Sequence, residues 1–238
     1  MRYLNRYKIF ALVLKYGIKN YKVVNGLVNV NGNVNLMMKK LKKLPLKFGV
    51  VTGSFRCEYN ELTSLEGAPN KVGGGFNCGD NKLINLEGGP KEVGGDFNCD
   101  NNRLTSLSGS PDKIGGDFNC SYNEITSLKG GPSEVGREFY CRQNKLVNLI
   151  GAPKSVGFSL HCEFNSLRSI EGMPENLGGN MECYNNPIYT LLSRVFDKFN
   201  SGRDKTPLEL FNDADIIRYE FQGHEINWVS IHLIPCGV

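Results

Sequence analysis

The chain has 238 residues, of which 40% are hydrophobic and 22% charged, a balance that excludes a disordered or fibrous protein. No apolar run approaches the ~20 residues that span a bilayer, and the stretch Ile9 to Leu14 is too short for a signal peptide. The sequence therefore predicts a cytoplasmic protein without a membrane span. The net charge of +4 hides an asymmetry, because residues 1–57 carry 12 Lys or Arg and no acidic residue.

This basic N-terminal segment leaves several interpretations open. It could bind nucleic acid, an anionic lipid surface or an acidic partner, or it could be a solvated face. Its lysines are scattered and lack interleaved aromatic residues at a recognisable spacing. The sequence therefore favours the solvated face.

Residues 1–33 are expected to form an N-terminal cap of one helix and one hairpin. Apolar residues at helical spacing predict a helix that ends near Gly17: Tyr3, Tyr7, Phe10, Leu14 and Ile18. Residues 21–30 then predict a hairpin that turns at Asn25-Gly26, a dipeptide typical of two-residue β-turns.

A repeat of 21 residues follows the cap. Its most regular positions are seven cysteines: Cys57, Cys78, Cys99, Cys120, Cys141, Cys162 and Cys183. Three residues after each cysteine stands an asparagine: Asn60, Asn81, Asn102, Asn123, Asn144, Asn165 and Asn186. Each unit continues with two aliphatic residues, a Gly-x-Pro step and mostly a Val-Gly pair, and begins with Phe or another apolar residue two positions before the cysteine. The period predicts eight rungs over residues 34–191.

The unit Phe-x-Cys-x-x-Asn-x-Leu-x-x-Leu-x-Gly-x-Pro resembles the core of the leucine-rich repeat. It is most similar to the short repeats of bacterial leucine-rich effectors and of phage-encoded repeat proteins. The resemblance implies a repeat solenoid, a leucine-rich-repeat-like parallel β stack with short turns, little helix and a concave strand surface. It also implies a phage protein that acts on a host factor in the host cytoplasm. Cysteine replaces the second strand leucine, and Gly-x-Pro replaces the effectors' Leu-Pro step.

Phe and Cys alternate with polar residues, which predicts that both point inward from a short strand. The asparagine amide, with two donors and an acceptor, is expected to pair backbone groups in the turn as an inner ladder. One cysteine per rung does not fit the C-x-x-C pairs of zinc sites, so the column is expected to be reduced core. The sequence thus predicts no metal, no disulfide and no cofactor.

The outward positions change along the stack. Around the central strands they are small and polar, as in Asp96, Asn98, Asp117 and Asn119. From the fifth cysteine onward they are larger, and we expect them to bind a protein partner: Glu138, Tyr140, Arg142, His161, Glu163, Phe164, Glu182 and Tyr184. Packing of these residues against a C-terminal cap is the alternative, which weighs most for Tyr184.

Residues 192–238 are expected to form that C-terminal cap. Ile188, Leu191, Leu192, Val195, Phe196 and Phe199 share a helical face, and Thr206-Pro207 predicts the start of a second helix. Residues 219–234 fit either a strand or a helix.

The leading functional hypothesis is a non-enzymatic protein-binding scaffold. One alternative is a virion or assembly component. Another is ligand binding or enzymatic activity in the C-terminal cap, around His224, Glu225, His232 and Cys236. No catalytic residues are predicted, because no known catalytic spacing includes a histidine of this chain.

Overall fold

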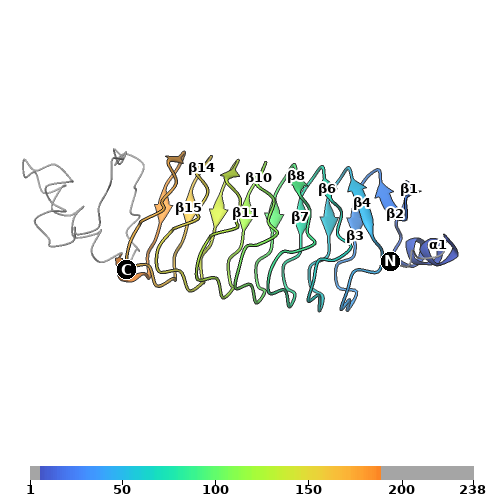
Figure 1. Cartoon of the computed structure of the whole chain (residues 1–238), viewed down its shortest axis with the longest axis horizontal. Coiled ribbons are helices and arrows are strands. Elements are labelled where there is room, and N and C mark those ends of the chain that lie inside the picture. Colours follow the sequence, from blue (N-terminus) through green and yellow to red (C-terminus); the bar gives the residue numbers. More distant parts are fainter. Residues whose placement is uncertain (1–5, 189–238) are drawn as a thin grey trace, which may run out of the picture.

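The computed structural model describes residues 6–188, which form a parallel β-solenoid with two sheets along its length (Figure 1). The nine-stranded sheet A contains β1 (Tyr21–Val24), β2 (Leu27–Val30), β4 (Phe48–Val51), β6 (Lys71–Val72), β8 (Glu92–Val93), β10 (Lys113–Ile114), β12 (Glu134–Val135), β14 (Ser155–Val156) and β16 (Asn176–Leu177). The eight-stranded sheet B contains β3 (Val34–Asn35), β5 (Phe55–Arg56), β7 (Phe76–Asn77), β9 (Phe97–Asn98), β11 (Phe118–Asn119), β13 (Phe139–Tyr140), β15 (Leu160–His161) and β17 (Met181–Glu182). Within sheet B each strand pairs in parallel with its equivalent 21 residues away. The predicted repeat solenoid is confirmed.

Sheet A was not predicted, because the sequence indicated only one strand per rung. Its short strands lie at the Val-Gly step, where Val93 and Ile114 are buried and their neighbours Glu92 and Lys113 are exposed. The glycine after the strand allows adjacent rungs to approach closely. A Cβ on Gly115 would lie 2.2 Å from the carbonyl oxygen of the equivalent glycine in the preceding rung. The repeated glycine is therefore required by rung spacing as well as by the turn.

The core consists of stacked columns of equivalent residues. Five phenylalanines form one column with ring centroids 5.2–5.6 Å apart: Phe55, Phe76, Phe97, Phe118 and Phe139. The predicted aliphatic pairs, such as Leu104 and Leu107, are fully buried on the third side of the rung. That side contains no regular strand among residues 34–188. Its backbone still forms hydrogen bonds to the preceding rung, and Glu124 N, for example, donates to Leu104 O at 2.9 Å.

The inner asparagine ladder is confirmed. Asn102 donates through Nδ2 to the carbonyl oxygens of Cys78, Cys99 and Asp100 at 3.0–3.2 Å, and its Oδ1 accepts from Leu83 N at 2.9 Å. One amide therefore pairs groups of its own rung and of the preceding rung. This pattern repeats from Asn60 to Asn186, so the column stabilises both the turn and the stacking of rungs.

The seven column cysteines are free and buried, as predicted. Their thiols behave as small core groups, and several donate to the next rung, as Cys162 Sγ does to Glu182 O at 3.2 Å. Burial raises the pKa of the Cys183 thiol to about 12, and it raises the pKa of Cys99 as well. These thiols stay protonated at neutral pH, which removes their nucleophilic form.

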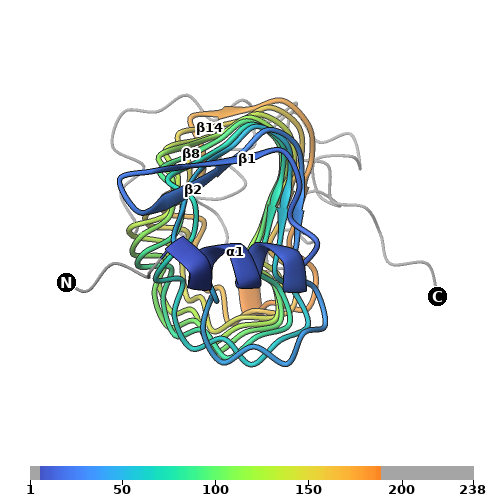
Figure 2. The same ribbon diagram turned by 90° about the vertical axis from the view of Figure 1, so that its right-hand side faces the viewer.

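The N-terminal cap confirms the predicted elements but corrects the predicted helix face. Strands β1 and β2 form the expected hairpin, with Asn25 and Gly26 at φ 50° and 76°. Helix α1 (Arg6–Lys15) lies across the end of the stack (Figure 2), and Gly17 at φ 64° follows it. Its buried residues are Ile9 and Val13.

The predicted apolar stripe faces solvent instead. Tyr7, Phe10 and Leu14 are 84%, 56% and 64% exposed, whereas Ile18 beyond the helix is buried as expected. Both helix faces are apolar in sequence, so spacing alone does not choose between them.

Two further groups of predictions concern membrane spans and the residues outside 6–188. Among residues 6–188 no helix has the length and hydrophobicity to cross a bilayer. Tyr3, the last three residues of the predicted rungs and the whole predicted C-terminal cap, with His224, Glu225, His232 and Cys236, lie outside the described residues.

Candidate interaction face on sheet B

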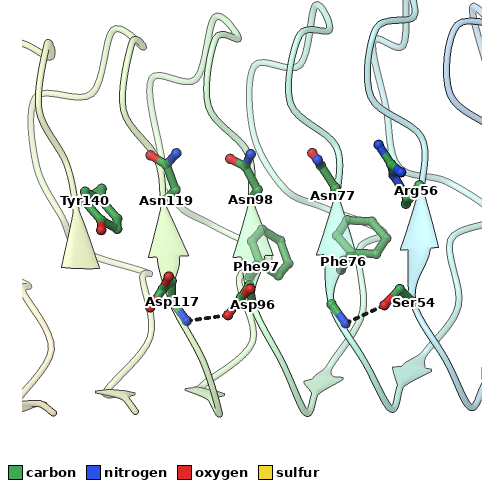
Figure 3. A pocket seen from close by; sticks show the side chains of 11 residues that line it. Ser54, Arg56, Phe76, Asn77, Asp96, Phe97, Asn98, Asp117, Asn119 and Tyr140 are labelled. Atoms are coloured by element: carbon green, nitrogen blue, oxygen red, sulfur yellow. Dashed lines mark hydrogen bonds between the residues drawn. The ribbon is translucent and has the colours of Figure 1, made fainter. Parts of the chain in front are cut away.

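The outward side chains of sheet B form rows that run along the solenoid (Figure 3). In the central rungs, Asn77, Asn98 and Asn119 occupy one row, and Tyr140 continues it. The Oδ1 of Asn98 accepts from the amide two residues ahead at 3.0 Å, as do its equivalents. These residues line an open hollow of about 370 Å³, together with others such as Gly75. The sequence did not predict this hollow, because the outward residues of its central rungs, such as Asn98 and Asp117, are small and polar.

The later rungs carry the larger side chains that the sequence predicted as a partner site. Tyr140 stacks on His161 with ring centroids 4.4 Å apart, and Phe164 contacts Tyr184 edge to face at 5.4 Å. The guanidinium of Arg142 lies 5.8 Å from the ring centroid of Tyr122. We name this set the late-rung face, made of Tyr122, Tyr140, Arg142, His161, Phe164 and Tyr184.

The predicted acidic residues occupy two different environments. Glu138 and Glu182 are half-buried and flank His161, with carboxylate oxygens 3.2 Å from Nε2 and 3.0 Å from Nδ1. Glu163 was expected to point outward, but it is only 1% exposed. The equivalent residues Glu58 and Ser121 are also buried, so the burial is a property of this position in the rung. Burial raises the pKa of the Glu163 carboxyl group, and a backbone hydrogen bond and the nearby His161 and Arg142 partly offset this rise.

Exposed aromatic residues recur at one edge position of sheet B; Phe164 was predicted as part of the partner site, whereas Tyr59 and Tyr122 were not. The residue before each ladder asparagine is left-handed, including Tyr59, Tyr122 and Phe164 at φ 54–55°. These three side chains are 43–52% exposed. Equivalent positions carry Asp80 or Asn101, the residue types that tolerate this backbone best. Bulky residues in this conformation store strain. The strain could not be predicted from the sequence, because it is recognised only from the φ angles.

The class of this protein is defined by its fold, because the comparisons with protein families and curated proteins found no relative. No protein-family model matches the chain, and no curated protein matches it. The structure places it among the repeat proteins built as parallel β-solenoids. Sheets A and B form nearly straight walls in Figures 1 and 2, rather than the curved strand surface that the leucine-rich-repeat motif implied.

Proposed function

We propose that the protein is a non-enzymatic binding scaffold that holds a protein partner on the late-rung face. The observation that carries this proposal is that the exposed, left-handed Tyr122 and Phe164 contact other large outward side chains, Arg142 and Tyr184, although Asn or Asp would fit the same backbone with less strain. Aromatic residues kept at a conformational cost are expected where they serve recognition.

The composition of the face supports a protein partner. Tyrosine and arginine dominate binding hot spots, because both combine a large contact area with polar groups. Tyr140 and Arg142 are half-buried and held by His161 and Tyr122, so they lose little freedom on binding. The hollow beside Tyr140 extends the surface toward the central rungs. A solenoid with a constant core and variable outward residues is suited to this role.

The test compares single substitutions on immobilised full-length protein incubated with a cell lysate. We expect a partner retained in equimolar amount by the parent to fall at least tenfold on Tyr140→Ala and on Arg142→Ala. Asn98→Ala, at the same outward row in the hollow, should weaken retention less than both. Quantitative mass spectrometry and melting temperatures of all variants provide the readout. Loss of retention on Asn98→Ala alone would move the site to the central rungs.

A further inference from the structure

Three ligand-type side chains from two neighbouring rungs meet at the centre of the late-rung face. One ligand atom each of His161, Glu163 and Glu182 lies within 4.8 Å of the other two. His161 and Glu182 occupy equivalent outward positions and pair across strands β15 and β17. Glu163 follows His161 by two residues, so it projects from the same side of its rung. The fold itself therefore brings the three groups together.

Glu163 gives the cluster an open ligand. Its side chain is buried, and its Oε2 has no hydrogen-bond partner. An unpaired buried carboxylate oxygen is costly unless a cation or donor meets it. The histidine arrangement adds a second feature, since Nδ1 faces Glu182 at 3.0 Å while Nε2 faces Glu138 at 3.2 Å. One nitrogen can therefore ligate while the other donates to a carboxylate.

We propose that His161 Nδ1, Glu163 and Glu182 bind a divalent first-row transition ion such as Zn²⁺, with Glu138 orienting the imidazole from behind. The ion would meet the unpaired Oε2 of Glu163, and a fourth position would remain for water or a partner's side chain. Tetrahedral ligands at ~2.1 Å from zinc lie ~3.4 Å apart. At present Nδ1 lies 3.0 Å from a carboxylate oxygen of Glu182, and the three ligand atoms all lie within 4.8 Å of one another.

The ligand set favours a transition ion over Ca²⁺ or Mg²⁺. Imidazole suits zinc and its neighbours, whereas the two hard cations prefer sites made of oxygen alone. Charge also favours a divalent ion, because three carboxylates surround one histidine here. Arg142 supplies part of the compensating charge for Glu163.

The first rungs provide an internal comparison. Glu58 occupies the position equivalent to Glu163, is 2% exposed and has an unpaired Oε2 as well. Its neighbour two residues back is Arg56, which forms an ion pair with it at 2.5 Å. Arginine cannot ligate a metal ion in this state, whereas His161 at the equivalent position can. The site is independent of the proposed partner, since it needs only residues of this chain.

The experiment uses full-length protein freed of metal with a chelator and then exposed to ZnCl₂. We expect a zinc content of one ion at this site and a rise in melting temperature of about 5 to 10 °C at a hundredfold excess over the Kd. CaCl₂ and MgCl₂ should produce no such rise. Zinc content after desalting, measured by plasma mass spectrometry, gives the stoichiometry independently of stability.

Three variants separate a site from incidental zinc uptake. Glu163→Gln and His161→Asn should each hold one ion fewer than the parent and lose the thermal shift, while Glu58→Gln should match the parent. If His161→Asn does not fold by circular dichroism, Glu182→Gln replaces it with the same expectation. Equal zinc content in the parent, Glu163→Gln and the histidine or Glu182 variant would overturn the site. An unchanged melting temperature of the parent with zinc would overturn it too.

Discussion

At the residue scale, inward positions of a rung are constrained by hydrogen bonding and packing, whereas outward positions are not. Asn102 in the inner column makes three donated bonds and one accepted bond, whereas outward Asn98 accepts a single local bond. The same residue type is thus structural in one column and free to vary in the other.

The inner role predicts the effect of Asn102→Ala. The substitution leaves the Leu83 amide without its partner and removes one of two donors from each of three carbonyl groups, which should lower the free energy of unfolding by about 1 to 3 kcal/mol. The outward control, Asn98→Ala, should cost less than about 1 kcal/mol. Urea denaturation followed by circular dichroism measures both. Equal midpoints for the parent and Asn102→Ala would contradict the ladder.

Most inner residues were predictable from the sequence, because a fixed period of 21 residues marks equivalent positions. The outward set was predicted by residue type, and the structure brings His161, Glu163 and Glu182 together. The burial of Glu163 was not predicted, because strict alternation along the strand places it outward, whereas the chain beyond the strand buries this position, as it also does at Glu58 and Ser121. Pairing of His161 with Glu182 could have been inferred, because they lie one period apart.

At the element scale, two-residue strands are stable here only because equivalent strands stack in register. Sheet A was missed, since a Val-Gly step between turns has no strand periodicity of its own. Helix α1 ends close to the predicted Gly17 but buries a different face from the predicted one. Its orientation is a tertiary property, because it depends on how the helix packs against the first rung of the stack.

The observed orientation of α1 predicts opposite outcomes for two adjacent positions. Val13 is 1% exposed, so Val13→Ala should destabilise the cap by about 2 kcal/mol through lost burial. Leu14 is 64% exposed, so Leu14→Ala should change stability by less than about 0.5 kcal/mol. Hydrogen exchange in residues 6–30 reads the cap separately from the rungs. Greater exchange in Leu14→Ala than in Val13→Ala would restore the face first expected.

At the scale of the whole molecule, the solenoid separates stability from recognition. Stacked Phe, Cys, Leu and Asn columns hold the rungs together, and they vary little along the chain. Outward residues change from small polar groups in the central rungs to aromatic and charged groups on the late-rung face. The proposed function depends on this separation.

The most direct test of the separation replaces a strained aromatic residue by one that fits its backbone. Tyr122→Asn relieves a left-handed tyrosine, a gain of about 1 kcal/mol that offsets the lost Arg142 contact of similar size. Tyr59→Asn makes the same change at φ 55° in the first rungs, away from the late-rung face.

We expect neither variant to melt below the parent, and we expect only Tyr122→Asn to lose the partner that the parent retains. The measurement is partner retention and melting temperature on the same preparations. A Tyr122→Asn protein that melts lower yet retains the partner would contradict the account, because the tyrosine would then serve the fold and not the face.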